Sequence, residues 1–141
     1  MLEKLKSMYT DAVGLPSKQI VPTVGLNIAK LEACDSKLVM WDLGGQIGLR
    51  AIWDKYYPEA HSLVFVVDGS CESQDARETF EHLLSHRDLG SIPVLVLANK
   101  SDIAGPGGTS SIQLDYQNVL SQSNRPSKVL SSCAHSGEGL R

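Results

Sequence analysis

Cysteine is scarce in this sequence of 141 residues: Cys34, Cys71 and Cys133 lie far apart and include no C-x-x-C pair. An odd number of isolated cysteines excludes the usual disulfide framework and the spacing of a structural zinc site. The pattern instead favours reduced thiols, and we therefore expect a cytoplasmic protein.

Long apolar runs and concentrated positive charge are also lacking. No apolar run reaches the roughly 20 residues that span a membrane, and no signal-peptide pattern opens the chain. Leu2, rather than glycine, follows Met1, which excludes N-myristoylation of the chain as written. A net charge of −3, without a run of Lys and Arg, offers no basis for a nucleic-acid partner. We expect contact with a membrane to be indirect only.

What is present is the composition of a globular domain. Hydrophobic residues make up 42% of the chain and charged residues 21%, which is typical of a soluble, folded protein. The length leaves room for one domain with a modest core, and we predict a single domain over residues 1–141.

Apolar spacing predicts strands that alternate with helices, and therefore an α/β fold with a parallel sheet. The continuous apolar runs 62–68 and 93–98 are typical of strands buried on both faces of such a sheet. The other predicted elements are a helix over 1–9, a hairpin of 26–33 and 37–42, helices over 47–60, 72–86 and about 112–120, and a strand over 127–132.

The most informative stretch is V-M-W-D-L-G-G-Q over 39–46. A short apolar run ends at Asp42, the glycines Gly44 and Gly45 follow, and Gln46 completes the stretch. Glycine lets main-chain N–H groups approach a ligand closely, and a carboxylate favours a hard cation such as Mg²⁺. This order predicts a site for a phosphate and its metal, with an ordinary turn as the plain alternative.

A second polar stretch, Asn99-Lys100-Ser101-Asp102, closes the predicted strand 93–98. The Asp102 carboxylate can accept hydrogen bonds from N1–H and N2–H₂ of guanine, while the stem of Lys100 covers the face of the ring. Taken alone, four such residues are more commonly a polar turn after a strand.

Three motifs in this order and spacing resemble switch I, switch II and the guanine-specificity motif of small GTPases. They are V-P-T-V-G-L-N-I over 21–28, W-D-L-G-G-Q over 41–46 and N-K-S-D over 99–102. The second is similar to the Arf/Arl branch, and residues 49–57 and 23–27 are most similar to a Golgi-associated member of it. The resemblance implies a fold like that of P-loop NTPases, with a parallel sheet and one antiparallel edge hairpin.

The resemblance implies a role for each residue at the phosphate end of the nucleotide. Thr23 would give its hydroxyl to Mg²⁺ and its N–H to the γ-phosphate, and Asp42 would hold Mg²⁺ through water. Gly44 and Gly45 would line the nucleotide, with the Gly45 N–H on the γ-phosphate. Gln46 would be the catalytic residue that orients the attacking water.

At the base end, the resemblance implies that Asn99, Lys100 and Asp102 bind guanine. The backbone of Cys133 and Ala134 would cap its O6 atom. The implied cofactors are GTP or GDP and Mg²⁺, and the implied reaction is hydrolysis of GTP to GDP and phosphate.

The resemblance also implies protein partners: an exchange factor, a GTPase-activating protein and effectors. Leu26, Trp41 and Tyr56 resemble the hydrophobic triad that the family presents to effectors. Packing in the core is the alternative, and for Trp41 the sequence favours neither the effector surface nor the core. The implied setting is the cytoplasmic side of the Golgi, in vesicle and protein transport.

No phosphate loop of the form G-x-x-x-x-G-K-S/T occurs among the 141 residues. In the family this loop and the central first strand precede the helix that begins here at Leu2. We therefore expect a domain truncated at both ends, with the hairpin separated from the other strands. We expect weak GTP binding without hydrolysis. A non-catalytic effector-binding module and an inert fragment remain as alternatives.

Two other patterns are weaker. His82 and His86 have metal-ligand spacing on one predicted helix, but they lack the glutamate of H-E-x-x-H, and a solvated helix face is favoured. The glycine-rich stretch 105–108 is not followed by a Lys-Ser/Thr pair, so we predict a loop.

Overall fold

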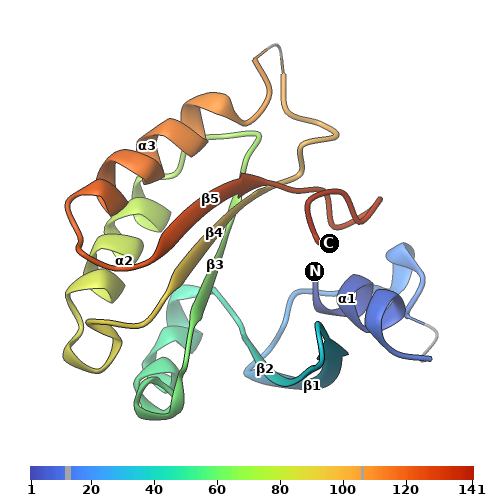
Figure 1. Cartoon of the computed structure of the whole chain (residues 1–141). Helices are drawn as coiled ribbons and strands as arrows, with labels where there is room; N and C mark the ends of the chain where they lie inside the picture. Colours follow the sequence, from blue (N-terminus) through green and yellow to red (C-terminus); the bar gives the residue numbers. More distant parts are fainter. Residues whose placement is uncertain (12–13, 106) are drawn as a thin grey trace. The chain divides into compact units, whose positions relative to one another are not determined.

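The computed structural model describes residues 1–11, 14–105 and 107–141. Residues 12, 13 and 106 fall in predicted loops and lie outside the described residues. The chain forms two compact units, Met1–Tyr56 and Tyr57–Arg141 (Figure 1). The prediction of a single domain stays a prediction.

An antiparallel hairpin dominates the first unit. Its strands β1 (Leu26–Ala33) and β2 (Ser36–Leu43) pair over their full length. The two connecting residues, Cys34 and Asp35, have φ angles of 50° and 57°. Two left-handed residues in a two-residue connection suit the right-handed twist of paired strands. The predicted hairpin is confirmed, with the second strand one residue longer at each end.

The helix α1 (Leu2–Tyr9) packs on one face of this hairpin. Its two end residues and Leu5 lie against Ala29 and Leu31 of β1. This spacing places the three side chains on one stripe of the helix. A short 3₁₀ turn, η1 (Ser17–Gln19), follows in the predicted loop.

Segment 47–60 differs from the one helix expected, because it consists of two sets of 3₁₀ turns. The first, η2 (Ile47–Lys55), buries none of its residues, and the second, η3 (Tyr57–Glu59), is a single short turn. Gly48 lowers the helix propensity near the start, and Pro58 disfavours α-helical backbone in the residue before it.

A parallel three-stranded sheet of order β3-β4-β5 forms the second unit. The α-helices of this unit lie on one side of the sheet (Figure 1). The elements are β3 (Leu63–Asp68), α2 (Gln74–Ser85), the 3₁₀ turn η4 (Arg87–Leu89), β4 (Val94–Asn99), α3 (Ser110–Ser121) and β5 (Ser127–Ser131). The predicted α/β class, with a parallel sheet and an antiparallel hairpin, is confirmed.

The core of the second unit lies between the sheet and these two helices. Phe80 of α2 is 0% exposed, and its ring centroid lies 4.9 Å from that of Phe65 and 5.1 Å from that of Tyr116. Val96 and Ala98 of the central strand are also completely buried. This packing of aromatic rings on aliphatic side chains fixes the strands, and with them the loops at their carboxyl ends.

The other face of the sheet contradicts one prediction. Segment 62–68 is predicted to be buried on both faces, yet Val64 and Val66 are 39% and 44% exposed. The prediction is wrong because α2 and α3 both cover the opposite face, and because β3 pairs only with β4 among the described residues. The central strand β4 is largely buried, as predicted.

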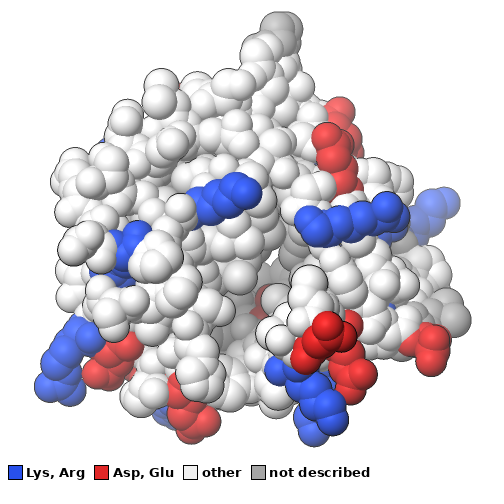
Figure 2. Space-filling view, in the orientation of Figure 1, with Lys and Arg blue, Asp and Glu red and all other residues white. Residues whose placement is uncertain are grey.

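In the described part of the chain, the hairpin and the parallel sheet are separate sheets, which confirms that expectation. On the face drawn in Figure 2, Lys and Arg side chains are interspersed with Asp and Glu. None of the described helices has both the length and the apolar character needed to cross a bilayer.

Replacing Phe80 with alanine should lower the free energy of unfolding by about 3–5 kcal/mol, because it leaves a cavity beneath the sheet. Urea denaturation followed by far-UV circular dichroism measures this loss. Val66→Ala is the control, since that side chain is partly exposed in the same unit, and it should cost less than about 1 kcal/mol. Equal losses for the two variants would contradict the assigned core.

Candidate functional site

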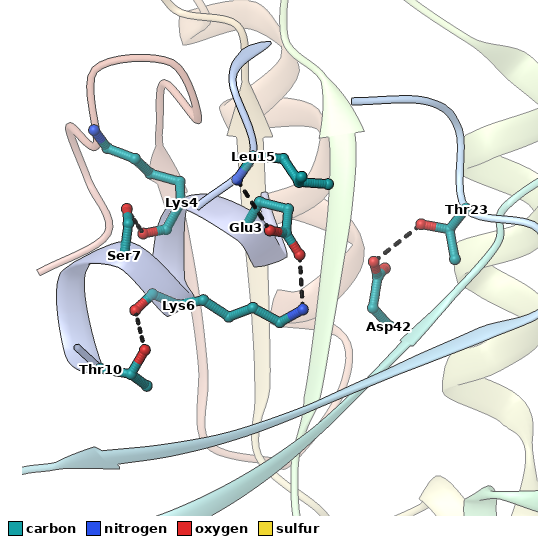
Figure 3. A network of polar contacts seen from close by, with 8 residues as sticks. All are labelled: Glu3, Lys4, Lys6, Ser7, Thr10, Leu15, Thr23 and Asp42. Atoms are coloured by element: carbon teal, nitrogen blue, oxygen red, sulfur yellow. Dashed lines mark hydrogen bonds and ion pairs between the residues drawn. The ribbon is translucent and has the colours of Figure 1, made fainter. Parts of the chain in front are cut away.

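The end of β2 brings a hydroxyl and a carboxylate together in the first unit. Oγ1 of Thr23 donates a hydrogen bond to Oδ2 of Asp42 at 3.0 Å, and both residues are half-buried (Figure 3). Mg²⁺ prefers oxygen ligands and is commonly held by one or two carboxylates together with phosphate oxygens. The pair therefore suits the predicted metal, and its role stays a prediction.

Gly44 joins the turn after β2 to the segment before β1. Its N–H donates to the carbonyl of Gly25 at 3.0 Å, and its carbonyl accepts from Nε1 of Trp53 at 3.1 Å. A Cβ at this position would lie 2.3 Å from the carbonyl oxygen of Thr23. Only glycine allows this approach, which places the backbone of the two predicted switch segments in contact.

Gly45 and Gln46 are exposed beyond this contact. A Cβ at Gly45 would meet no atom within 4 Å, so its backbone has open space beside it. The Gly45 carbonyl accepts from Nε of Arg50 at 3.0 Å, and the Gln46 carbonyl accepts from the N–H of Leu49 at 2.8 Å. The geometry leaves the Gly45 backbone and the Gln46 side chain accessible to a ligand, and their roles stay predictions.

The predicted effector triad, Leu26, Trp41 and Tyr56, is half-buried. The ring centroids of Trp41 and Tyr56 lie 5.5 Å apart. Trp41 lies opposite Ile28 in the hairpin, on the face that α1 does not cover. Ile28 and Val39 on this face are 51% and 57% exposed. These exposed apolar neighbours favour a docking surface over core packing, while binding of effectors stays a prediction.

In the second unit, Asn99 ties the loop after β4 to the loop after β5. Its Oδ1 accepts from the N–H of Ala134 at 2.9 Å and from Oγ of Ser132 at 3.4 Å. The N–H of Ser101 donates to the carbonyl of Ser132 at 3.1 Å. The predicted guanine-reading turn and the 132–134 segment are therefore one connected structure.

The groups predicted to contact guanine differ in whether they are free to bind a ligand. Asp102 is exposed at the end of the turn, so a ligand can reach its carboxylate. By contrast, the N–H of Cys133 donates to the carbonyl of Glu138 at 3.0 Å, and that of Ala134 donates to Asn99. Their predicted contact with O6 of guanine would require one of these hydrogen bonds to be shared or exchanged.

Lys100 has an ion-pair partner that the sequence interpretation missed. Its Nζ donates to Oδ2 of Asp68 at 2.6 Å, across 32 residues of sequence. Asp68 ends β3 and lies opposite Asn99 in the parallel register. Because adjacent parallel strands end at the same edge of a sheet, the carboxylate at the end of the predicted strand was the available signal.

The ion pair shifts the pKa of both groups. Partial burial alone would raise the pKa of Asp68, but hydrogen bonds from Lys100 and Ser70 outweigh it and lower the pKa from 3.8 to about 2. The same hydrogen bond to Asp68 raises the pKa of Lys100. Since the folded-state pKa of Asp68 is depressed, its stabilising contribution is present above the unfolded value and is lost as the pH falls toward 2.

Of the two histidines predicted to lie on one helix, only His82 lies in α2, because the helix ends at Ser85 and His86 follows it. Nδ1 of His86 accepts from the N–H of Asp88 at 3.2 Å, and its ring packs 4.7 Å from that of Tyr57. No group of three or more His, Cys, Asp or Glu residues among those described could hold a metal ion. This arrangement favours a structural role for His86.

A cavity of about 370 Å³ lies between α2 and α3 of the second unit. Val67 and Ile112 contribute apolar lining, and the ion pair between Arg77 and Asp115 forms part of the wall. None of the predicted site residues lines this cavity, and no sequence motif marked it.

Gly44→Ala should destabilise the first unit by about 1–3 kcal/mol, because the added methyl group would overlap the Thr23 carbonyl. Chemical denaturation measures the change, and amide chemical shifts of residues 23–25 should move with it. Gly45→Ala is the matched control, since space is open there, and its effect should stay below about 1 kcal/mol. Similar behaviour of the two alanine variants would contradict the close approach at Gly44.

Comparison with known proteins bears on the motifs of both units. The model of the ADP-ribosylation factor family matches residues 6–141. ADP-ribosylation factor-related protein 1 of Homo sapiens is 34% identical over 144 residues, which cover 99% of this chain and 72% of that protein. ADP-ribosylation factor-like protein 14 of Mus musculus is 36% identical over 124 residues, which cover 85% of this chain and 65% of that protein.

Among solved structures, the chain is similar to the Arl6 BBS3 small GTPase from Trypanosoma brucei with bound nucleotide analogue GppNp. The TM-score is 0.77 at 24% sequence identity, and the match covers 99% of this chain and 83% of the other. This similarity shows a small-GTPase fold. With the family match over almost the whole chain, it follows that the protein belongs to the ADP-ribosylation factor family of small GTPases.

Proposed function

We propose that this chain recognises guanine nucleotides through the turn 99–102 and serves as an Arf-family molecular switch. The observation that carries the proposal is the bond from the Ala134 N–H to Oδ1 of Asn99. It holds the guanine-specificity motif against a second loop at the carboxyl edge of the parallel sheet, where ligands of α/β proteins bind.

The chemistry of the turn supports guanine as the base. The exposed Asp102 carboxylate offers two acceptor oxygens for the N1–H and N2–H₂ donors of guanine. Adenine has no such pair of donors, so the same carboxylate discriminates against it. The stem of Lys100 supplies an apolar surface for the face of the ring.

The first unit supplies groups suited to the metal and the phosphates. Thr23 and Asp42 are the residues that would hold Mg²⁺, which when bound neutralises charge on the transferred phosphoryl group. The N–H of Gly45 has open space for a phosphate oxygen, and the exposed Gln46 amide is available to orient a water molecule.

Affinity for the phosphates depends on groups other than those that recognise the base. The 141 residues contain no G-x-x-x-x-G-K-S/T motif, whose N–H groups and lysine bind the phosphates in sites of this kind. We therefore expect these residues by themselves to bind GTP more weakly than about 1 μM and to hydrolyse it negligibly.

In the cell, the proposed role is a switch in vesicle and protein transport, in a cytoplasmic protein associated with the Golgi. Its proposed partners are an exchange factor, a GTPase-activating protein and effectors that contact Leu26, Trp41 and Tyr56. Support comes from similarity to ADP-ribosylation factor-related protein 1 and from the exposed apolar residues beside Trp41.

A non-catalytic effector-binding module is the second candidate. The observation that favours it is the hairpin face on which Ile28 and Val39 are about half exposed beside Trp41. Such a face is suited to a protein partner even when no nucleotide is bound.

Titration of a fluorescent GDP analogue with Mg²⁺ into the purified chain tests base recognition. We expect weak but saturable binding, with unlabelled GTP displacing the probe at least about tenfold better than ATP, because only guanine matches Asp102. Equal displacement by ATP, or no binding up to about 1 mM probe, would overturn the nucleotide proposal and favour the effector-binding module.

Asp102→Asn should weaken GTP binding by roughly 10–100-fold and improve binding of xanthosine triphosphate, because the amide can donate to the carbonyl oxygen on C2 of xanthine. Competition against the same fluorescent probe measures both affinities. Asp35→Asn is the matched control, since it removes one carboxylate at the hairpin turn and should change neither affinity. Unchanged selectivity in Asp102→Asn would show that this residue does not read the base.

A further inference from the structure

The ion pair between Asp68 and Lys100 lies at the carboxyl edge of the parallel sheet. Asp68 is the last residue of β3, and Lys100 is the first residue after β4. Their side chains are 31% and 50% exposed, and Nζ approaches Oδ2 to 2.6 Å. A charge-assisted hydrogen bond of this length is among the stronger polar contacts in proteins.

The carboxylate of Asp68 is itself held in one orientation. Its other oxygen, Oδ1, accepts from the N–H of Ser70 at 2.9 Å and from Oγ of Ser70 at 2.6 Å. The N–H of Gly69, the residue between Asp68 and Ser70, donates to the carbonyl of Asn99 at 2.6 Å. A Cβ at Gly69 would lie 2.6 Å from Cγ2 of Thr109, so the turn after β3 packs tightly against Thr109. Oδ2 is thereby directed at Lys100.

Lys100 also has a constrained backbone. Its φ angle is +69°, in the left-handed region that residues with long side chains seldom adopt. The Asn99 carbonyl accepts from the N–H of Gly69, and the N–H of Ser101 donates to the carbonyl of Ser132, so hydrogen bonds hold the peptide groups on either side of Lys100. With the backbone fixed in this way and Nζ fixed by Asp68, the four-carbon stem between them has few conformations left.

We propose that Asp68 is a positioning residue for base recognition, which holds the Lys100 stem in the extended form that covers the face of a bound guanine. The inference rests on the proposed function. Without Asp68, the lysine side chain would sample several rotamers and would have to be ordered again on each binding event. The carboxylate thus prepares the apolar surface of the site before the base arrives.

The matched variants are Asp68→Asn and Glu72→Gln. The first keeps the shape of the side chain and removes the charge that binds Lys100, and the second removes a charge at an exposed position four residues on. With the fluorescent GDP analogue and Mg²⁺, Asp68→Asn should raise the dissociation constant roughly 3–10-fold. Glu72→Gln should leave it within about twofold.

A double-mutant cycle separates positioning from a general structural role. Lys100→Met keeps an apolar stem but has no ammonium group for Asp68 to hold. Asp68→Asn should therefore have almost no further effect on GDP affinity in the Lys100→Met background. An equal loss in both backgrounds would overturn the inference, because Asp68 would then act by a route other than Lys100.

A measurement without nucleotide tests the pair itself. In chain carrying ¹³C-dimethylated lysines, Asp68→Asn should lower the pKa of Lys100, while Glu72→Gln should not. If the pKa falls but GDP affinity is unchanged, the positioning role is wrong and the proposed function stands. If the unmodified chain shows no preference for guanine, the proposed function fails and the inference fails with it.

Discussion

The parallel pairing of β4 with β3 and β5 is the constraint on which the candidate guanine site depends. Because parallel strands end together, the loops after all three meet at one edge of the sheet. Three long-range contacts then join those loops: Lys100 to Asp68, Asn99 to Ala134 and Ser101 to Ser132. A slip of one residue in the register of β4 would turn its side chains to the opposite face and break all three contacts.

The first unit achieves its arrangement by a different route. Its candidate groups do not follow adjacent parallel strands but depend on one close approach of backbone at Gly44. Glycine is required there for lack of space rather than for an unusual φ angle, and the resulting hydrogen bond to Gly25 sets the two predicted switch segments side by side. The hydroxyl–carboxylate pair of Thr23 and Asp42 lies next to that contact.

The sequence was informative where chemistry is local and failed where it depends on distant packing. The hairpin, the central strand and the polar turn after it follow from periodicity and from short motifs. The exposure of Val64 and the ion pair of Asp68 depend on which strands and helices are neighbours, and the hydrophobic periodicity does not predict those neighbours. The hydrogen bonds donated by the N–H groups of Cys133 and Ala134 could not be predicted either, since every residue except proline has such a donor and the sequence does not indicate its acceptor.

The two sets of candidate residues also differ in how firmly the chain holds them. The candidate guanine-reading turn follows a buried strand and is fixed by hydrogen bonds on both sides of Lys100. The residues after Gly45 continue into η2, a run of 3₁₀ turns that buries none of its residues. Local opening costs little where few apolar groups are buried, so η2 is a segment that a ligand can reorder against a small opposing free energy. This division of stability would suit the proposed switch, in which one part stays fixed to read the base while another responds to what is bound.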